Sequence, residues 1–380
     1  MIAKILLIAA LSFLALLHPA VVAAAAECKF PQPHEQRGIH MTADNALDPA
    51  MLARFIKFAR ANNLNTVVVD MNESLRLVDN EDAARRVAAR LLAACLNPIG
   101  RFVVFKGDRS WLPNPINGEP AKPSLLLWSN KDHIWRDQGK NIWINPMDPW
   151  AWKIVIEQIG VVAKAGFRTV QLDYVRFPTD GTTSDPISNI DYGLFAITPE
   201  IKRAVITNFV RKTVRVLKEQ HPSLRIATDL FGYSALITNQ RDPSGNGQDI
   251  RAIAATGVDE IVSMAYPALF DPGYACDIPA KCPDKVIRAA LTKTSEYLKV
   301  TQPKVQLCTY IQAFTTRSRK TEVTIPYGAN EVKAQIKAAE EAGVTCWYLW
   351  NPVRLAGAQK KFPFQPDFFP THIRALARKD

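Results

Sequence analysis

Short runs of β-branched and apolar residues alternate with amphipathic helical stretches along most of the chain, and this alternation constrains the fold more than any other feature. Repeated strand–helix units form parallel sheets, because each helix crosses back over the sheet before the next strand begins. Eight such units close a barrel, so the sequence predicts a (β/α)8 barrel. The strand candidates are Gly38–Thr42, Thr66–Asp70, Arg101–Lys106, Thr169–Asp173, Arg225–Asp229, Glu260–Met264, Lys304–Ile311 and Cys346–Trp350.

Helical stretches fit between these strand candidates, for example at residues 49–63, 81–95, 149–166 and 330–343. An open, doubly wound sheet is the structural alternative, but its usual Gly-rich turn after the first strand is not in this sequence. The longest insertions follow the third, fourth and sixth strand candidates, and they fall at residues 107–147, 179–198 and 269–285. These loops gather at the C-terminal face of a barrel, where barrel enzymes carry their active sites.

Residues 1–26 have the composition of a secretory signal peptide: one basic residue, an apolar run and a small-residue cleavage site. An uncleaved membrane anchor is the alternative, but the apolar run is shorter than the roughly 20 residues that a spanning helix needs. No linker or repeat divides the rest of the chain. We therefore expect an exported protein, secreted or periplasmic, in which residues 27–380 form a single barrel domain.

The formal net charge of +11 raises the question of an anionic partner, such as nucleic acid or an acidic polysaccharide. The Lys and Arg residues are scattered through helical stretches such as residues 201–218, and they form no dense basic run. A solvated basic surface is the preferred interpretation, and we expect no nucleic-acid partner.

Six cysteines in an exported chain permit disulfides. A bridge between Cys276 and Cys282 would pin a short Pro-containing loop, and a Cys28–Cys95 bridge is possible, although sequence alone does not set the connectivity. Cys308 and Cys346 fall inside strand candidates, where we expect buried reduced thiols. No Cys or His spacing resembles a zinc site, so no metal or cofactor is expected.

Polar residues stand at or just beyond the C-terminal ends of five strand candidates. Packing of a barrel strand requires no charged residue at this end, whereas catalysis uses such residues there. A helix cap or a salt bridge is the alternative for any one of them. The five are Asp70, Lys106, Asp173, Asp229 and Gln312.

Asp173 is the strongest candidate among these residues. In TVQLD, Val170 and Leu172 share the face that packs against the outer helices, so Asp173 turns into the barrel. Arg176 follows three residues later, and we predict that its guanidinium returns to the rim and holds this carboxylate ionised. A structural Asp–Arg pair that closes the top of the barrel is the alternative.

Asp229 has the same inward parity in the next strand candidate. Adjacent strands lie about 4.8 Å apart, which brings two rim carboxylates within the roughly 5 to 9.5 Å that glycoside hydrolases use. Their proximity separates their pKa values, leaving one group ionised and the other protonated as a general acid. We therefore predict that Asp173 and Asp229 form the catalytic pair.

Aromatic residues fall in the same C-terminal loops, where flat apolar faces suit sugar rings. A single Trp is more often part of a core, but several in one loop favour a binding cleft. These aromatic residues are Trp111, Trp128, Trp135 and Trp143 after the third strand, Tyr233 after the fifth, Tyr266 after the sixth and Trp350 in the eighth. The predicted substrate-binding residues are Arg176, Tyr233, Tyr266, Gln312, Trp350, Asp70 and Lys106.

Six runs together resemble, in order and spacing, the bacterial putative glycosyl hydrolase domain family, whose (β/α)8 barrels are remotely similar to α-amylase-like hydrolases. The runs are GFRTVQLDYVRFP, WINPMDPWAW, ATDLFGY, SMAYPALF, YIQAF and QIKAAEEAGVTCWYLWNP. The resemblance implies a retaining-type site with Asp173 as nucleophile and Asp229 as acid/base. Two departures stand out: Ala268 and Leu269 replace a usual Ser-His pair, and Ala313 replaces a usual Asp.

The sequence thus predicts an exported glycoside hydrolase that acts on a polysaccharide or oligosaccharide. The two departures from the family pattern motivate a second hypothesis, a catalytically weak or inactive carbohydrate-binding barrel. A metal-dependent deacetylase fits poorly, because no His/Asp ligand cluster is visible and His40 is the sole His in a strand candidate.

Overall fold

The structure, a computed structural model, describes residues 28–73, 77–107, 125–193, 197–236, 245–317, 324–351 and 362–375. Eight parallel strands close into a barrel, each beside the barrel strand that precedes it in the chain, and the last pairs with the first. The strands are β1 (Arg37–Met41), β2 (Thr66–Asp70), β3 (Asn97–Val103), β8 (Thr169–Asp173), β10 (Arg225–Phe231), β11 (Glu260–Met264), β12 (Gln306–Gln312) and β15 (Cys346–Trp350). The predicted (β/α)8 barrel is confirmed.

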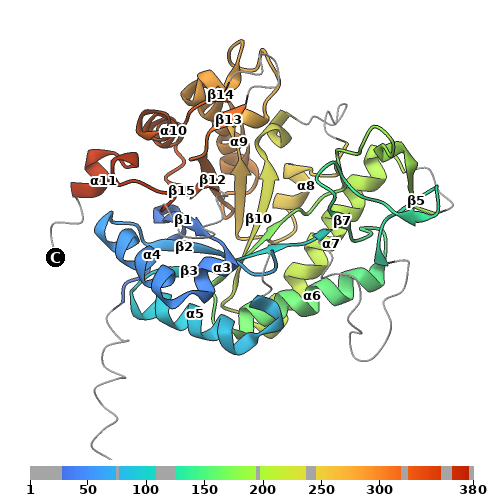
Figure 1. Ribbon diagram of the computed structural model, residues 1–380, viewed down its shortest axis with the longest axis horizontal. Helices are drawn as coiled ribbons and strands as arrows, with labels where there is room; N and C mark the ends of the chain where they lie inside the picture. The colour runs from blue at the N-terminus through green and yellow to red at the C-terminus, as the bar shows by residue number, and fades with distance from the viewer. Residues whose placement is uncertain are drawn as a thin grey trace, which may run out of the picture.

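Helices surround the barrel on its outer face (Figure 1). The long ones are α4 (Pro49–Ala61), α5 (Glu81–Ala93), α6 (Pro149–Lys164), α7 (Pro199–Gln220), α9 (Pro283–Thr301) and α10 (Ala329–Glu341), and the short ones are α3 (Ala43–Leu47), α8 (Ile250–Ala254) and α11 (Thr371–Ala375). Asp48, Asp148 and Thr198 cap α4, α6 and α7 by accepting backbone N–H groups, each directly before a Pro in the first turn. In the part of the chain that the structure describes, no helix combines the length and apolarity needed to span a membrane.

Side chains alternate along each barrel strand between the helices and the barrel interior. Val170 and Leu172 on β8 lie in the large apolar cluster between strands and helices. Val68, Ile99 and Val262 belong to a second, smaller cluster that fills the barrel interior. The predicted parity of β8 is therefore confirmed, and its inward residues belong to the interior layers.

The third barrel strand is displaced from its prediction. Arg101–Lys106 was expected, whereas β3 covers Asn97–Val103. Pro98 lies near the start of the strand, where a missing N–H is tolerated, and its carbonyl accepts a hydrogen bond from Arg168 N–H at 3.1 Å. Arg101 consequently lies in mid-strand, and Lys106 leaves the barrel for the short strand β4 (Lys106–Gly107).

Three disulfides are present, and one of them contradicts the sequence-based expectation. Cys28–Cys95 and Cys276–Cys282 form as considered. The expectation of reduced thiols at Cys308 and Cys346 is wrong, because these two residues form the third bridge. They are register partners on β12 and β15 and both face the barrel interior, so their Cα atoms lie only 4.6 Å apart.

The insertions after β3 and β8 build small sheets of their own beside the barrel. β4 pairs with β7 (Ile142–Trp143), and β5 (Trp128–Ser129) pairs with β6 (His133–Ile134) and β9 (Ile190–Asp191). This part of the molecule lies to the right in Figure 1, next to α7.

The indoles of these insertions form a local core. Trp135 and Trp143 are fully buried, and their Nε1–H groups donate to the carbonyl of Asp185 and to Oδ2 of Asp137. The prediction of a cleft lined by the Trp residues of this loop is therefore wrong for these two, because an insertion of this size needs apolar side chains to hold itself together. Trp128 lies half-buried on β5, and Trp111 falls outside the described residues.

Candidate active site

A cavity of about 900 Å³ lies at the carboxyl ends of the barrel strands. It contains five of the residues that the sequence singled out: Asp173, Arg176, Tyr233, Tyr266 and Trp350. It also contains residues that the sequence analysis did not select, among them Arg101, Gln138, Asp180, Phe231, Met264 and Asp271. The volume suits an organic ligand larger than a single sugar unit.

Arg101 organises the floor of this cavity. The side chain is 2% exposed, and its Nε and Nη2 groups donate to Oδ2 of Asp173 at 3.0 and 2.6 Å. Nη1 donates to Oδ1 of Asp70 at 2.5 Å and to Oε2 of Glu73 at 2.8 Å. One guanidinium thus holds three carboxylates, and charge-assisted hydrogen bonds of this kind fix both partners in one geometry.

The strand register explains why these groups meet. Asp70 on β2 pairs with Arg101 on β3, and Val103, two residues further along the same face, pairs with Asp173 on β8. The Arg101 side chain therefore has one inward carboxylate beside it and another one layer above. The ring of Trp350 covers the guanidinium, with Cζ 4.6 Å from the ring centre.

Asp70 is the most deeply held of the carboxylates around Arg101. Burial alone would raise its pKa, but the charges of His40 and Arg101 outweigh burial and lower the pKa of Asp70 to about 2. His40 Nε2 lies 2.9 Å from Oδ1 of Asp70, and its ring packs on Trp350 with ring centres 3.9 Å apart. Asp70 was predicted to bind substrate; its partners instead place it beneath the cavity as a support for Arg101.

A pH titration of stability tests the support that Asp70 gives. A carboxyl whose pKa is depressed from 3.8 to about 2 stabilises the fold above the higher value, and the contribution is lost as pH falls through the lower one. We expect Asp70→Asn to lower the free energy of unfolding by on the order of 2 kcal/mol at neutral pH, with the difference from wild type shrinking between pH 4 and pH 2. Urea unfolding at a series of pH values measures this. Asp82→Asn, at a side chain that is 76% exposed, is the control that changes little.

The residue after Asp173 has an unusual backbone conformation. Tyr174 has φ of +52°, in the left-handed region, which an aromatic residue adopts at a cost of about 1 kcal/mol or more. Its N–H turns back and donates to Oδ1 of Asp173 at 2.5 Å. Asp173 therefore has both oxygens engaged, Oδ2 by Arg101 and Oδ1 by this turn, and its side chain lines the cavity in a fixed orientation.

The predicted pairing of Arg176 with Asp173 is wrong. Among the described residues, the guanidinium that reaches Asp173 is that of Arg101. Arg176 lines the cavity, but its Nη1 donates to the carbonyl of Phe177 at 3.0 Å and to Thr179 Oγ1 at 3.4 Å. Arg176 lies three residues after the end of β8, and the left-handed turn at Tyr174 changes the direction of the chain before it. The alternation of side chains along the strand therefore does not predict where the Arg176 side chain lies.

Asp229 faces the barrel interior as predicted, but it lies beneath the cavity. The residue is 0% exposed, and the cavity wall above it on the same strand is Phe231. Gln171 Nε2 donates to Oδ1 of Asp229 at 2.5 Å, while Oδ2 has no hydrogen-bond partner among the described residues. Burial, and next the charge of Asp173, raise the pKa of Asp229 well above its usual range, which favours the protonated form of this carboxyl.

Two further predicted substrate-binding residues serve the scaffold. Gln312 is fully buried; its Oε1 accepts the N–H of Ala268 at 3.2 Å, and its Nε2 donates to the carbonyl of Phe314. Lys106 contacts Glu73 Oε1 at 3.2 Å and lies over the Tyr174 ring, 4.2 Å from its centre. Neither side chain is part of the described cavity lining, although Lys106 contacts the lining residue Tyr174.

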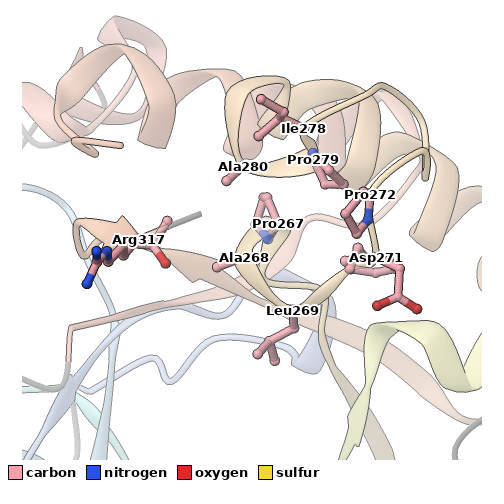
Figure 2. Close-up of a pocket in the computed structure, with 11 residues that line it drawn as sticks. Pro267, Ala268, Leu269, Asp271, Pro272, Ile278, Pro279, Ala280 and Arg317 are labelled. Carbon is pink, nitrogen blue, oxygen red and sulfur yellow. The ribbon is translucent and has the colours of Figure 1, made fainter. Parts of the chain in front are cut away.

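Two of the three positions at which this sequence departs from the family pattern follow β11. Ala268 and Leu269 belong to the short helix η7 (Pro267–Leu269). Ala268 and Leu269 both border a small pocket of about 40 Å³ between η7 and residues 278–280. Leu269 points away from Pro272 and Ile278 and also lines the large cavity (Figure 2). An apolar side chain therefore stands in the cavity wall at the position where relatives usually carry a His.

Arg101 is the main residue that the sequence analysis missed. The signal for it was a charged side chain inside an apolar strand run, which must find buried partners of opposite charge. In the described part of the chain, no group of three or more His, Cys, Asp or Glu side chains is arranged to hold a metal ion. The positive charge among Asp70, Glu73 and Asp173 is the guanidinium itself.

Three solved structures share this fold at low sequence identity. The chain aligns with an endo-1,4-beta-D-mannanase from Thermotoga petrophila at a TM-score of 0.56 and 10% identity, covering 90% of this chain and 99% of that one. It aligns with a beta-galactosidase from a psychrophilic Marinomonas at a TM-score of 0.57 and 10% identity, covering 90% of this chain and 58% of that one. It aligns with Amy13B from Eubacterium rectale at a TM-score of 0.51 and 9% identity, covering 87% of this chain and 68% of that one. These similarities establish the barrel fold.

The family assignment comes from the sequence itself. A comparison with curated proteins found no match. The model of the family described as "Putative glycosyl hydrolase domain" matches residues 38–354, which run from β1 to just beyond β15 and include the whole barrel and every candidate site residue. The chain therefore belongs to this glycosyl hydrolase domain family.

Proposed function

We propose that this protein is an exported glycoside hydrolase that cleaves glycosidic bonds of a polysaccharide or oligosaccharide, with Asp173 as the nucleophile. The observation that carries the proposal is the arrangement of Asp173, a carboxylate fixed by Arg101 and the Tyr174 N–H at the floor of an aromatic-lined cavity of about 900 Å³. Membership of a glycosyl hydrolase domain family supports the reaction class.

The cavity has the surfaces that carbohydrate binding requires. Trp350, Tyr266 and Tyr233 offer aromatic faces and polar edges, and Gln138 and Thr179 offer hydrogen-bonding groups. Asp173 lies at the C-terminal end of its strand, where barrel enzymes place catalytic groups. An anionic side chain there can attack the anomeric carbon or stabilise the positive charge that develops on the sugar.

We further propose that Asp229 supplies the proton for the leaving group. Burial raises the pKa of this carboxyl and so favours its protonated form, and the charge of Asp173 on the neighbouring strand adds to that shift. Two carboxyl groups whose environments separate their pKa values are the pair that glycoside hydrolysis uses. Oδ2 of Asp229 has no hydrogen-bond partner among the described residues, so this oxygen can carry the proton.

Replacement of Asp229 tests the acid role. An amide cannot donate the proton, so we expect Asp229→Asn to slow hydrolysis of natural glycosides by about 10²- to 10⁴-fold. Aryl glycosides with acidic leaving groups need little protonation, and their hydrolysis should fall much less. The measurement is kcat/KM on matched pairs of such substrates, together with NMR of the first-formed anomer, which distinguishes retention from inversion.

Two other carboxylates provide the comparison for that experiment. Asp180 and Asp271 also line the cavity. Loss of the proton donor slows natural glycosides much more than aryl glycosides with acidic leaving groups. If Asp180→Asn or Asp271→Asn shows this difference and Asp229→Asn does not, then the proton donor is a cavity carboxylate and the assignment of Asp229 is wrong.

A carbohydrate-binding barrel without turnover is the second candidate, and one observation favours it. Asp229 is fully enclosed beneath the cavity, and Ala313, at the position where relatives carry an Asp, is 2% exposed and offers no acid. Calorimetric titration with glycans, followed by product analysis at high protein concentration, separates the two functions. Binding without released product would support the binding barrel.

Export also belongs to this proposal. Residues 1–26, which lie outside the described residues, have the composition of a signal peptide, and residues 27–380 would then be a single catalytic domain. The three disulfides fit an oxidising compartment, because such bonds are rare in cytosolic proteins.

A further inference from the structure

Two arginines line the cavity, and their surroundings differ. Arg101 forms ion pairs with three carboxylates, those of Asp70, Glu73 and Asp173. Arg176 is almost as deeply buried, at 6% exposed, yet within the described residues no carboxylate forms an ion pair with it. Burying a charge is costly unless a partner of opposite charge compensates it. Arg176 therefore carries a positive charge that the described part of the protein leaves unmatched.

Aromatic rings hold the Arg176 guanidinium in place. Its Cζ lies 4.9 Å from the ring centres of Trp143 and Tyr174 and 5.1 Å from that of Phe231. Such contacts favour a cation at this position. The side chain is thus pre-oriented by three rings, of which Tyr174 and Phe231 line the cavity and Trp143 lies in the core of the insertion.

The hydrogen bonds of Arg176 use one nitrogen. Nη1 donates to the Phe177 carbonyl and to Thr179 Oγ1. Among the described residues, neither Nε nor Nη2 of Arg176 has a hydrogen-bond partner. Neither atom is fully buried, so both are accessible. The Nε/Nη2 edge is one of the two edges with which arginine binds two oxygens of an anion at once.

The carboxylates that line the same cavity do not fill this role. Asp173 is held by Arg101 and the Tyr174 N–H, and Asp271 is exposed at the cavity wall formed after β11. Asp180 has interactions of its own, and the hydrogen bonds of Arg176 to described residues go to Phe177 and Thr179. Within the described residues no carboxylate occupies this edge, which leaves it for an anionic group of the ligand.

We propose that the substrate is an acidic carbohydrate, and that its carboxylate or sulfate group binds the Nε/Nη2 edge of Arg176. This inference rests on the proposed function for the kind of ligand, but binding alone tests it. Two parallel N–H···O bonds from a pre-oriented arginine discriminate strongly against a ligand that lacks the anion, because such a ligand leaves the buried charge unmatched.

The test compares acidic oligosaccharides with neutral partners of the same backbone. Uronate oligosaccharides are paired with their carboxyl-reduced forms, and sulfated oligosaccharides with their desulfated forms, over several backbones. We expect calorimetry with wild type and with Asp173→Asn to give at least one acidic member that binds on the order of tenfold or more tightly than its neutral partner. Whichever series shows the preference identifies the anion as carboxylate or sulfate.

Variants at Arg176 assign that preference to this side chain. Arg176→Gln should abolish it, and Arg176→Lys should keep part of it, because lysine retains the charge without the two-donor edge. Arg168→Gln is the matched control: Arg168 precedes the same strand β8 at its other end and lies over Phe30, 4.1 Å from the ring centre, so its loss should leave the preference unchanged.

Two results would overturn the proposal: equal binding of acidic and neutral partners throughout the panel, or an acidic preference that survives in folded Arg176→Gln. If Arg176→Gln does not fold, Arg176→Lys and the wild-type comparison still decide. A failure of the proposed hydrolysis is a separate outcome, because it removes turnover in wild type and leaves the binding preference intact.

Discussion

Replacing Asp173 with Asn is expected to remove hydrolysis almost completely, by on the order of 10⁴-fold or more in kcat, as the loss of a nucleophile does in other hydrolases. The amide has the same shape but no negative charge, so it neither attacks the anomeric carbon nor stabilises the transition state. Arg101 keeps Asp70 and Glu73 as partners in this variant, and the fold should survive. The measurement is kcat on any glycan that wild type cleaves.

The control for Asp173→Asn must separate loss of chemistry from loss of binding. We expect calorimetry to give nearly unchanged affinity for the same glycan, because Asp173 contributes one of many lining groups. Asp180→Asn, a cavity carboxylate outside the Arg101 cluster, should retain far more activity. Wild-type rates in Asp173→Asn would show that the nucleophile lies elsewhere.

Removing the charge of Arg101 is expected to have the largest effect on stability. Arg101→Gln leaves Asp70, Glu73 and Asp173 close together without their shared cation, and loss of one partner from a buried ionic cluster costs on the order of 3 to 5 kcal/mol. Urea unfolding at pH 7 measures the loss. The deficit should shrink below about pH 4, because protonation removes the repulsion among the carboxyl groups.

Arg85 provides a surface counterpart for this experiment. It contacts Glu81 and Asp82 on α5, but its side chain is 54% exposed. Exposed ion pairs contribute little, so Arg85→Gln should change the free energy of unfolding by less than about 1 kcal/mol. If Arg101→Gln behaves like Arg85→Gln, the buried cluster does not stabilise the fold as proposed.

The barrel could be predicted because the alternation of apolar strand runs with amphipathic helical stretches repeats along the sequence. The parity of TVQLD placed Asp173 correctly, since alternation on a strand follows from backbone geometry alone. The third strand was predicted to begin at Arg101, after Pro98, whereas β3 begins at Asn97. Arg101 was therefore taken as the first residue of a strand and was not recognised as a charged residue in the middle of one.

Contacts between strands were harder to obtain from sequence than the strands themselves. The Cys308–Cys346 bridge requires two register partners, and register is set by packing rather than by local pattern. Arg176 illustrates the same limit beyond a strand end, because the left-handed turn at Tyr174 has no composition signal. Nor does sequence separate Trp143, which is buried, from Trp350, which lines the cavity.

The bridge between Cys308 and Cys346 also bears on how the protein is made. It joins β12 to β15 across 38 residues, inside the barrel, where both cysteines are 0% exposed. Thiol–disulfide exchange requires an oxidant to reach the sulfur atoms, which the finished barrel does not allow. The bond must therefore form while the last βα unit is still open, so oxidation precedes barrel closure during biogenesis, and a chain that closes before it is oxidised keeps two sealed thiols.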